Sequence, residues 1–185
     1  TTIREGVTVN RATSYAWKTV VGSHCLLMAN AHVAHDCVVG HHVILANGVN
    51  LAGHVIIDDY AILEGVVAVQ QFVKIGQHSF IAGGSLVRKD VPPYVKAARE
   101  PLSYIGINKI GLERRGFDAK TIQIIQKIYK KLFVRKGIWK DAIDKVALEF
   151  ADYEVQKEIL DFIFQSQKGI IKGFQAAKIS KNGMI

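Results

Sequence analysis

The sequence predicts a parallel β-helix of six-residue repeats, followed by a small all-α domain. Three observations predict this fold. Aliphatic residues recur at every sixth position in the first half of the 185-residue chain, and small or β-branched residues recur at a second fixed position. Helical spacing replaces this period after Pro101. We expect the β-helix over 1–92, a linker over 93–104 and the helical domain over 105–185.

The six-residue period begins at Ile3 and continues to Val87. Every member is aliphatic except Tyr15, and the residue four positions after each member is small or β-branched. The period of a helix, about 3.6, and that of a flat strand, about 2, do not explain this pattern. The pattern instead indicates a chain that turns a corner every six residues, so that three short strands make one coil of 18 residues.

Successive coils then stack as parallel sheets, with the aliphatic residues inside and the small residues near the corners. Hexads such as LAGHVI at 51–56 resemble those of the left-handed β-helix family, and this resemblance implies a left-handed coil. The hexad YAWKTV at 15–20 fits the pattern poorly, and we expect it to bulge out as a loop. Cys25 and Cys37 occupy the small position, which predicts buried, unreactive thiols.

Charge divides the chain at Pro92. Residues 1–92 contain six basic and six acidic residues, whereas the remaining 18 basic and 10 acidic residues supply the whole net charge of +8. All seven histidines lie in the neutral half. The basic half predicts an acidic partner, which could be nucleic acid, an anionic membrane or an acidic protein.

Composition excludes several classes of protein. An apolar share of 49% with 22% charged residues excludes a disordered chain. Two cysteines make neither a disulfide framework nor a zinc-finger spacing. No apolar run reaches the roughly 20 residues of a membrane span, and the N-terminal residues lack the pattern of a signal peptide. The sequence therefore predicts a soluble, cytoplasmic protein without a membrane span.

Helical patterns fill the second half. Each candidate helix has an apolar stripe and a polar face, as expected of a small antiparallel bundle. The expected helices run near 105–115, from Asp118 as N-cap through Leu132, over about 138–151 and over 154–167. The tail, 178–185, is expected to fray.

The coil arithmetic also predicts a site. Side chains 18 positions apart lie above one another at about 4.8 Å, the strand spacing of a sheet. The polar residues form three such ladders: His35, Gly53 and Gln71; Asp36, His54 and Phe72; and His32 with Asn50. These ladders predict a polar patch two or three coils tall.

Two chemistries fit this patch. Three imidazoles could hold a metal, as in zinc hydrolases. Alternatively, His35 could act as a general base, with the Gly53 amide stabilising an oxyanion. Asp36 could fix the tautomer of His35 only if the corner turns both side chains together, because adjacent residues of a flat strand point to opposite faces.

Several motifs stand in order along the chain: NAHVAHDC at 30–37, LAGH at 51–54, QF at 71–72, DVPPY at 90–94 and GLERRGF at 111–117. Together they closely resemble the acyl-carrier-protein:UDP-N-acetylglucosamine O-acyltransferase family, which performs the first step of lipid A synthesis. The resemblance implies transfer of a 3-hydroxyacyl chain from acyl carrier protein to the 3-hydroxyl of UDP-N-acetylglucosamine. It also implies a homotrimer with sites between neighbouring prisms, and neither a metal nor a cofactor.

The resemblance implies a role for each matching residue. His35 matches the catalytic base, Asp36 its orienting partner and Gly53 the residue whose amide faces the oxyanion. Residues implied to contact the substrates are His32, His54, Gln71, Asn108, Arg114 and Arg115, the last three through the nucleotide or the donor's phosphopantetheine. Gly83 matches the position that limits acyl length, and glycine there implies a groove open to a longer chain.

The chain departs from the family pattern at three places. Gln70 stands where the family often has histidine, and Ile110 stands where it often has an acidic residue. The family's earlier coils are absent before Thr1, and the open sheet edges predict lower solubility than that of a longer chain.

Other functions predict different results. Another hexapeptide-repeat acyltransferase would use coenzyme A as donor or an amino sugar as acceptor, and fold alone does not exclude it. A metal hydratase of the β-helix type would lose activity on chelation. A nucleic-acid-binding protein would use the basic helical residues Lys127, Lys130, Lys131, Arg135 and Lys136, although these also fit a solvated helix face.

Overall fold

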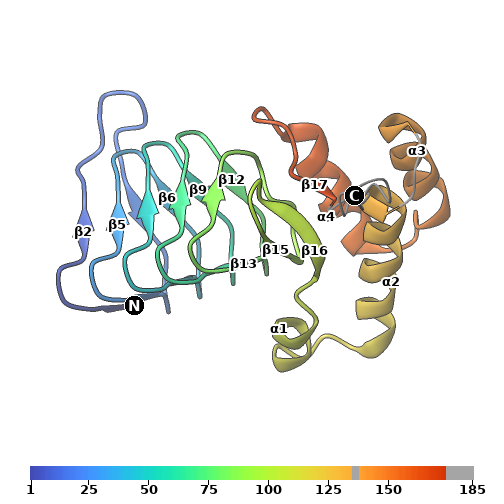
Figure 1. Ribbon diagram of the computed structural model, residues 1–185, viewed down its shortest axis with the longest axis horizontal. Helices are drawn as coiled ribbons and strands as arrows, with labels where there is room; N and C mark the ends of the chain where they lie inside the picture. Colours follow the sequence, from blue (N-terminus) through green and yellow to red (C-terminus); the bar gives the residue numbers. More distant parts are fainter. Residues whose placement is uncertain (135–137, 174–185) are drawn as a thin grey trace, which may run out of the picture.

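The computed structural model describes residues 1–134 and 138–173. Short strands wind into coils that stack side by side from the N-terminal end, and the helices gather at the other end (Figure 1). Neighbouring coils pair in parallel, with His32 beside Asn50 and Ile56 beside Lys74. The predicted parallel β-helix is confirmed.

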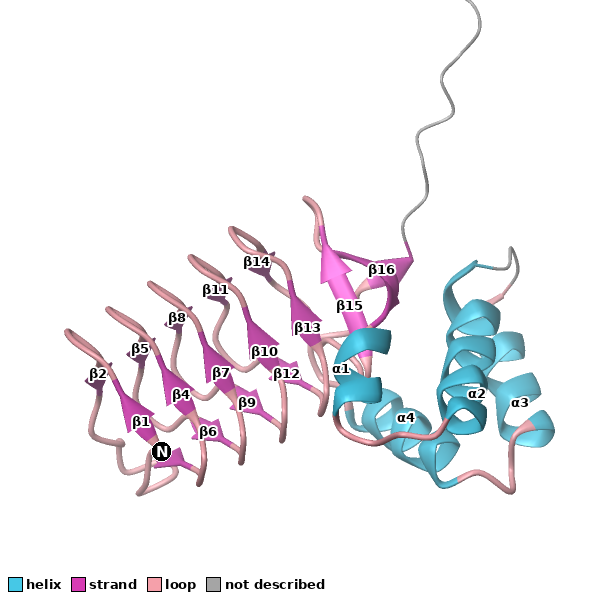
Figure 2. Cartoon of the chain, turned by 90° about the horizontal axis from the view of Figure 1, so that it is seen from below, coloured by secondary structure: helices cyan, strands magenta, loops and turns pink. Residues whose placement is uncertain are grey.

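The strands form three sheets, which are the three faces of the prism (Figure 2). The first face contains, in spatial order, β1 (Thr2–Ile3), β4 (Leu26–Leu27), β7 (Ile44–Leu45), β10 (Ile62–Leu63), β13 (Phe80–Ile81), β15 (Val95–Ala98), β16 (Ser103–Ile107) and β17 (Lys172–Gly173). The second face contains β2 (Thr8–Val9), β5 (His32–Val33), β8 (Asn50–Leu51), β11 (Ala68–Val69) and β14 (Leu86–Val87). The third face contains β3 (Val20–Val21), β6 (Val38–Val39), β9 (Ile56–Ile57) and β12 (Lys74–Ile75).

The aliphatic position fills the prism. From Leu27 to Val87, every side chain at this position is at most 3% exposed. Ile3 and Val9 are more exposed, at 59% and 46%. Tyr15 also departs from the pattern, since it lies on a loop and is 77% exposed.

Shortening a side chain in the prism core is expected to destabilise the protein more than shortening one on its surface. Leu45 is fully buried between Leu27 and Leu63 of the adjacent coils. We expect Leu45→Ala to reduce the free energy of unfolding by about 2–5 kcal/mol, because it leaves a cavity. The matched control is Leu86→Ala, at a side chain that is 40% exposed, with an expected loss below about 1 kcal/mol. Equal losses in chemical denaturation would contradict this account of the core.

The first coil is six residues longer than the others. Thr8 pairs with His32, 24 positions away, whereas Val20 pairs with Val38, 18 positions away. The additional residues lie in the loop 10–19 between β2 and β3. The predicted bulge at 15–20 is therefore confirmed, except that Val20 belongs to β3.

Residues 93–104 do not form the expected linker. β15 pairs in parallel with β13 and antiparallel with β16, so the first face continues past the last complete coil. Buried and exposed residues alternate through β15, and the hairpin satisfies backbone groups that would otherwise form an open sheet edge. The first helix consequently begins at Lys109 and not near residue 105.

The helical domain follows the predicted order. Its elements are α1 (Lys109–Arg114), α2 (Ala119–Tyr129), a π-helical turn η1 (Lys130–Val134), α3 (Trp139–Glu149) and α4 (Glu154–Gln165). Asp118 caps α2 as predicted, since its Oδ1 accepts from the Thr121 amide at 2.9 Å. The predicted fraying at 178–185, and the basic residues Arg135 and Lys136, lie outside the described residues.

Hydrogen bonds of two buried tyrosines attach the helices to the prism. The Tyr94 hydroxyl donates to Glu158 of α4, and the Tyr129 hydroxyl donates to the Pro93 carbonyl at 2.5 Å. Both tyrosines are at most 1% exposed. None of the described helices has the length and apolar character needed to cross a membrane.

Candidate active site

The predicted polar patch forms at the corner between the second and third faces, where β5 leads to β6. Asp36 occupies this corner with a left-handed backbone, φ 60°. The bend turns its side chain toward the preceding one, and His35 Nδ1 lies 2.8 Å from Asp36 Oδ2. The corner therefore turns both side chains together, which is the condition under which Asp36 can fix the tautomer of His35.

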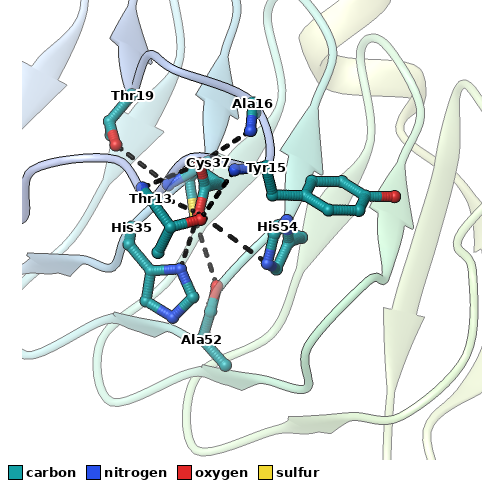
Figure 3. A network of polar contacts seen from close by, with 9 residues as sticks. Thr13, Tyr15, Ala16, Thr19, His35, Cys37, Ala52 and His54 are labelled. Atoms are coloured by element: carbon teal, nitrogen blue, oxygen red, sulfur yellow. Dashed lines mark hydrogen bonds and ion pairs between the residues drawn. The ribbon is translucent and has the colours of Figure 1, made fainter.

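Donors surround the Asp36 carboxylate, which is 4% exposed. Figure 3 shows three of the residues that supply them, Thr13, Ala16 and His35, gathered around one carboxylate. Its Oδ1 accepts from the amides of Thr13 at 3.1 Å and Ala16 at 3.3 Å, and its Oδ2 accepts from the Thr13 hydroxyl at 2.7 Å. Desolvation raises the pKa of Asp36, but the hydrogen bonds from His35, Thr13 and Ala16 outweigh it and lower this pKa to about 2.

The charge on Asp36 determines the tautomer of His35. A carboxylate with a pKa of about 2 is ionised at neutral pH and can only accept, so Nδ1 of His35 carries the proton. Nε2 then keeps a free lone pair, as a general base requires. Because the pKa of an unfolded aspartate is about 3.9, ionised Asp36 stabilises the fold above about pH 4, and this contribution disappears as the pH falls toward 2.

The neighbouring coil supplies aromatic contacts. His54 Nε2 lies 3.8 Å from Asp36 Oδ2, and the His54 ring stacks on Phe72 with a centroid separation of 4.6 Å. The predicted ladder of Asp36, His54 and Phe72 is thus present. Tyr15 of the loop 10–19 meets the His54 ring edge-on, with the centroids 4.8 Å apart.

Gly53 lies directly against the His35 ring. A Cβ on Gly53 would stand 2.5 Å from His35 Cε1 and 2.7 Å from Nε2, so a side chain there would displace the imidazole. Within residues 1–134 and 138–173, the Gly53 amide makes no hydrogen bond, and it can donate to a bound group. Glycine at position 53 therefore leaves room for the His35 ring and keeps the backbone amide accessible to a bound group.

A metal centre fits the corner less well. Ligand atoms of His35, Asp36 and His54 do lie within 4.8 Å of one another. However, both oxygens of Asp36 already accept from amide, hydroxyl or imidazole donors. Among the described residues, His32 is not part of this group, so the corner does not bring three imidazoles together. The donors favour a histidine–aspartate pair over a cation.

The other candidate residues of the prism occupy two places. Gln71 is exposed and continues the ladder of His35 and Gly53. Gly83 is exposed on the segment between β13 and β14, and its amide donates to Glu64 Oε2 at 3.1 Å. A Cβ on Gly83 would meet the Gly65 carbonyl oxygen at 3.2 Å. A side chain at this position would therefore fill space between the two neighbouring coils.

The candidates from α1 lie at a different corner. Asn108 is 7% exposed and donates to the His78 carbonyl at 3.0 Å, and Arg115 donates to the Tyr60 carbonyl at 3.3 Å. Arg114 ends α1 and is exposed. Tyr60 follows β9 whereas His54 precedes it, so the third face separates this corner from the His35 corner. One chain therefore does not bring all the candidate residues together.

Sequence reasoning missed a column of rings at this second corner. The column consists of His24, His42, Tyr60, His78 and Tyr94, with adjacent centroids 4.5–5.7 Å apart. Burial, and to a smaller extent the charge of the nearby Arg115, lower the pKa of His78 to about 4. The His78 imidazole is therefore neutral at pH 7. The spacing of 18 between the first four members is the signal that could have revealed the column.

Two segments of the chain match known protein families. Residues 90–171 match a family described as UDP-N-acetylglucosamine O-acyltransferase, domain 2, and residues 18–53 match the bacterial transferase hexapeptide repeat. A Rhizobium rhizogenes protein named acyl-[acyl-carrier-protein]–UDP-N-acetylglucosamine O-acyltransferase is 45% identical over 163 residues, which are 88% of this chain and 60% of the relative. A Myxococcus xanthus protein of the same name is 40% identical and is covered over 66% of its length.

Solved structures show the same similarity. A UDP-N-acetylglucosamine acyltransferase from Francisella novicida superposes with a TM-score of 0.88 at 41% identity, over 92% of this chain and 63% of that chain. The corresponding enzyme from Campylobacter jejuni superposes with a TM-score of 0.86 at 34% identity, over 94% of this chain and 68% of that chain. The chain thus spans about three fifths to two thirds of these relatives.

Proposed function

The chain belongs to the acyl-carrier-protein:UDP-N-acetylglucosamine O-acyltransferase family, and from this we propose that it transfers a 3-hydroxyacyl chain from acyl carrier protein to the 3-hydroxyl of UDP-N-acetylglucosamine. The observation that carries the proposal is the His35–Asp36 hydrogen bond of 2.8 Å, with Gly53 directly against the His35 ring.

The mechanism assigns one task to each residue. Nε2 of His35 takes the proton of the sugar 3-hydroxyl while its oxygen attacks the thioester carbonyl carbon. The carbonyl oxygen becomes an oxyanion, to which the Gly53 amide donates. The intermediate then collapses to an ester, the carbon–sulfur bond breaks, and the imidazolium returns its proton to the thiolate. Asp36 stabilises the imidazolium throughout.

Substrate contacts complete the proposed site. His32, His54 and Gln71 flank the His35 corner and offer donors and acceptors to the sugar. The open surface at Gly83 suits a long acyl chain. Reduced, buried Cys25 and Cys37 fit a reducing compartment, and we expect the reaction to take place in the cytoplasm.

A homotrimer would complete the site. Asn108, Arg114 and Arg115 belong to the nucleotide or donor site only if the second corner of one chain meets the His35 corner of another. The face between the corners is suited to such contact, since Val38 and Ile56 are 38% and 39% exposed there. We expect the intact protein to have the mass of three chains in light scattering, and a monomer that transfers acyl groups would contradict this arrangement.

Acyl carrier protein is the acidic partner that the charge predicts. Lys127 and Lys130 are exposed on α2 and η1, within the half of the chain that carries the net charge of +8. We expect the KM for the carrier-protein donor to rise several-fold as the salt concentration rises from 50 to about 500 mM, because salt screens this attraction. The KM for UDP-N-acetylglucosamine is the internal control. Equal salt dependence for both substrates would argue against a basic docking surface.

The function is tested by product analysis. The protein is mixed with UDP-N-acetylglucosamine and a panel of 3-hydroxyacyl carrier proteins, and the esters are identified by mass spectrometry. Parallel reactions with acyl-coenzyme A and with a 3-amino acceptor test the rival acyltransferases. Ester formation from carrier protein is the expected result, whereas turnover of coenzyme A alone, or acylation of nitrogen alone, would favour the alternative.

A further inference from the structure

The loop 10–19 reaches from the first coil to the catalytic corner of the next coil. The hydroxyl of Thr13 and the amides of Thr13 and Ala16 all donate to Asp36. At the far end of the loop, Thr19 Oγ accepts from the Asp36 amide at 2.9 Å. The loop therefore holds both the carboxylate and the backbone of Asp36. Figure 3 shows Thr13, Ala16 and Thr19 of this loop beside His35.

We propose that this loop is a working part of the active site, in which Thr13 is a positioning residue that acts on His35 through Asp36. The proposal rests on the proposed role of His35 as general base. It gives a function to the loop 10–19, which contains the six residues by which the first coil is longer than the others.

The atoms that meet at Asp36 carry the argument. Oδ2 accepts from the Thr13 hydroxyl at 2.7 Å and from His35 Nδ1 at 2.8 Å, so both donors share one oxygen. The Thr13 oxygen in turn accepts from the Tyr15 amide at 3.2 Å, which orients the hydroxyl toward Asp36. A loop that only connected two strands would not need to direct three donors at one buried carboxylate.

Loss of the hydroxyl has a defined electrostatic consequence. With one donor fewer, the charge on Oδ2 is less neutralised and attracts the His35 imidazolium more strongly. His54 also faces this carboxylate, with Nε2 at 3.8 Å from Oδ2. Burial, together with the nearby Asp36 charge, raises the pKa of the Cys37 thiol, but this thiol donates to the Ala52 carbonyl. Tyr15 contacts the His54 ring from the loop side. These groups remain in place when only the Thr13 hydroxyl is removed.

The test is Thr13→Val, which keeps the shape of the side chain and removes its donor. The His35 ring is titrated by NMR without substrates, and kcat is measured against pH. We expect the His35 midpoint and the acid limb of the kcat profile to move to higher pH by about half a unit to one unit. We also expect the plateau kcat to fall by about tenfold, because the imidazole is less firmly oriented.

Two controls separate this effect from a loss of structure. Thr13→Ser retains the hydroxyl and is expected to restore the titration midpoint and kcat. Thr121→Val removes a chemically equivalent bond, from Thr121 Oγ to Asp118 Oδ2 at 2.6 Å, and is expected to leave the His35 titration unchanged. If valine at position 13 prevents folding, Thr13→Ala is measured in its place.

An unchanged midpoint and an unchanged profile in the folded Thr13 variant would overturn the proposal. So would a serine variant that behaves like valine, since the hydroxyl would then be irrelevant. The titration needs no turnover. Failure of the wild-type protein to transfer an acyl chain would refute the proposed function, and the NMR comparison would still test the link from Thr13 through Asp36 to His35.

Discussion

Replacing His35 with alanine is expected to lower kcat by about 10²- to 10⁴-fold, because the reaction loses the group that takes the hydroxyl proton. The Asp36 contact fixes the proton on Nδ1, and the side chain is 39% exposed, so Nε2 is available to a bound sugar. Truncation removes this base without opening the core. Steady-state rates of ester formation, with both substrates saturating, measure the loss directly.

Asn30→Ala is the control for this variant. Asn30 is also an exposed corner residue with a left-handed backbone, φ 61°, but it lies between β4 and β5, at the corner that joins the first and second faces. We expect its kcat to stay within about threefold of wild type. The acid limb of the pH profile should persist in Asn30→Ala and vanish in His35→Ala. Equal rates for His35→Ala and wild-type protein would refute general-base catalysis by this residue.

Much of the prism could be predicted because its interactions repeat. Each coil places the same kinds of residue at the same positions, so Leu45 and Leu63 are paired in adjacent coils and equally buried. The same arithmetic brought His35 to Gly53 and Asp36 to His54. Asp118 could be identified as an N-cap because capping depends on a few consecutive residues.

The remaining features depend on contacts that no local pattern contains. The hairpin of β15 and β16 forms because a sheet edge at β13 is available to pair with it. Thr13 reaches Asp36 because the loop folds toward the next coil, and a poor hexad predicts a bulge but not its direction. His35 and Asp36 come together because Asp36 has a left-handed backbone. The sequence does not reveal this conformation, so the contact could be predicted only on the condition that the chain turns there.

The second large effect is expected at Gly53, where the glycine protects the position of the base. A Cβ there would be 2.5 Å from His35 Cε1, whereas ordinary contacts begin at about 3.4 Å, so the ring must move by about 1 Å. A displacement of this size can cost about 10²-fold in rate when the reacting groups must be aligned. We therefore expect Gly53→Ala to lower kcat by about 10²-fold, although it removes no functional group.

Gly65→Ala tests whether the loss comes from this contact or from alanine in a tight coil. Gly65 has the same position in its hexad, but its nearest neighbour would be the Asn47 carbonyl oxygen at 3.5 Å, an ordinary contact. We expect Gly65→Ala to keep both its melting temperature and its kcat near wild type. If the two variants lose activity equally, the coil and not the His35 ring is responsible. A selective loss in Gly53→Ala would show that catalysis depends on where the imidazole lies as well as on its presence.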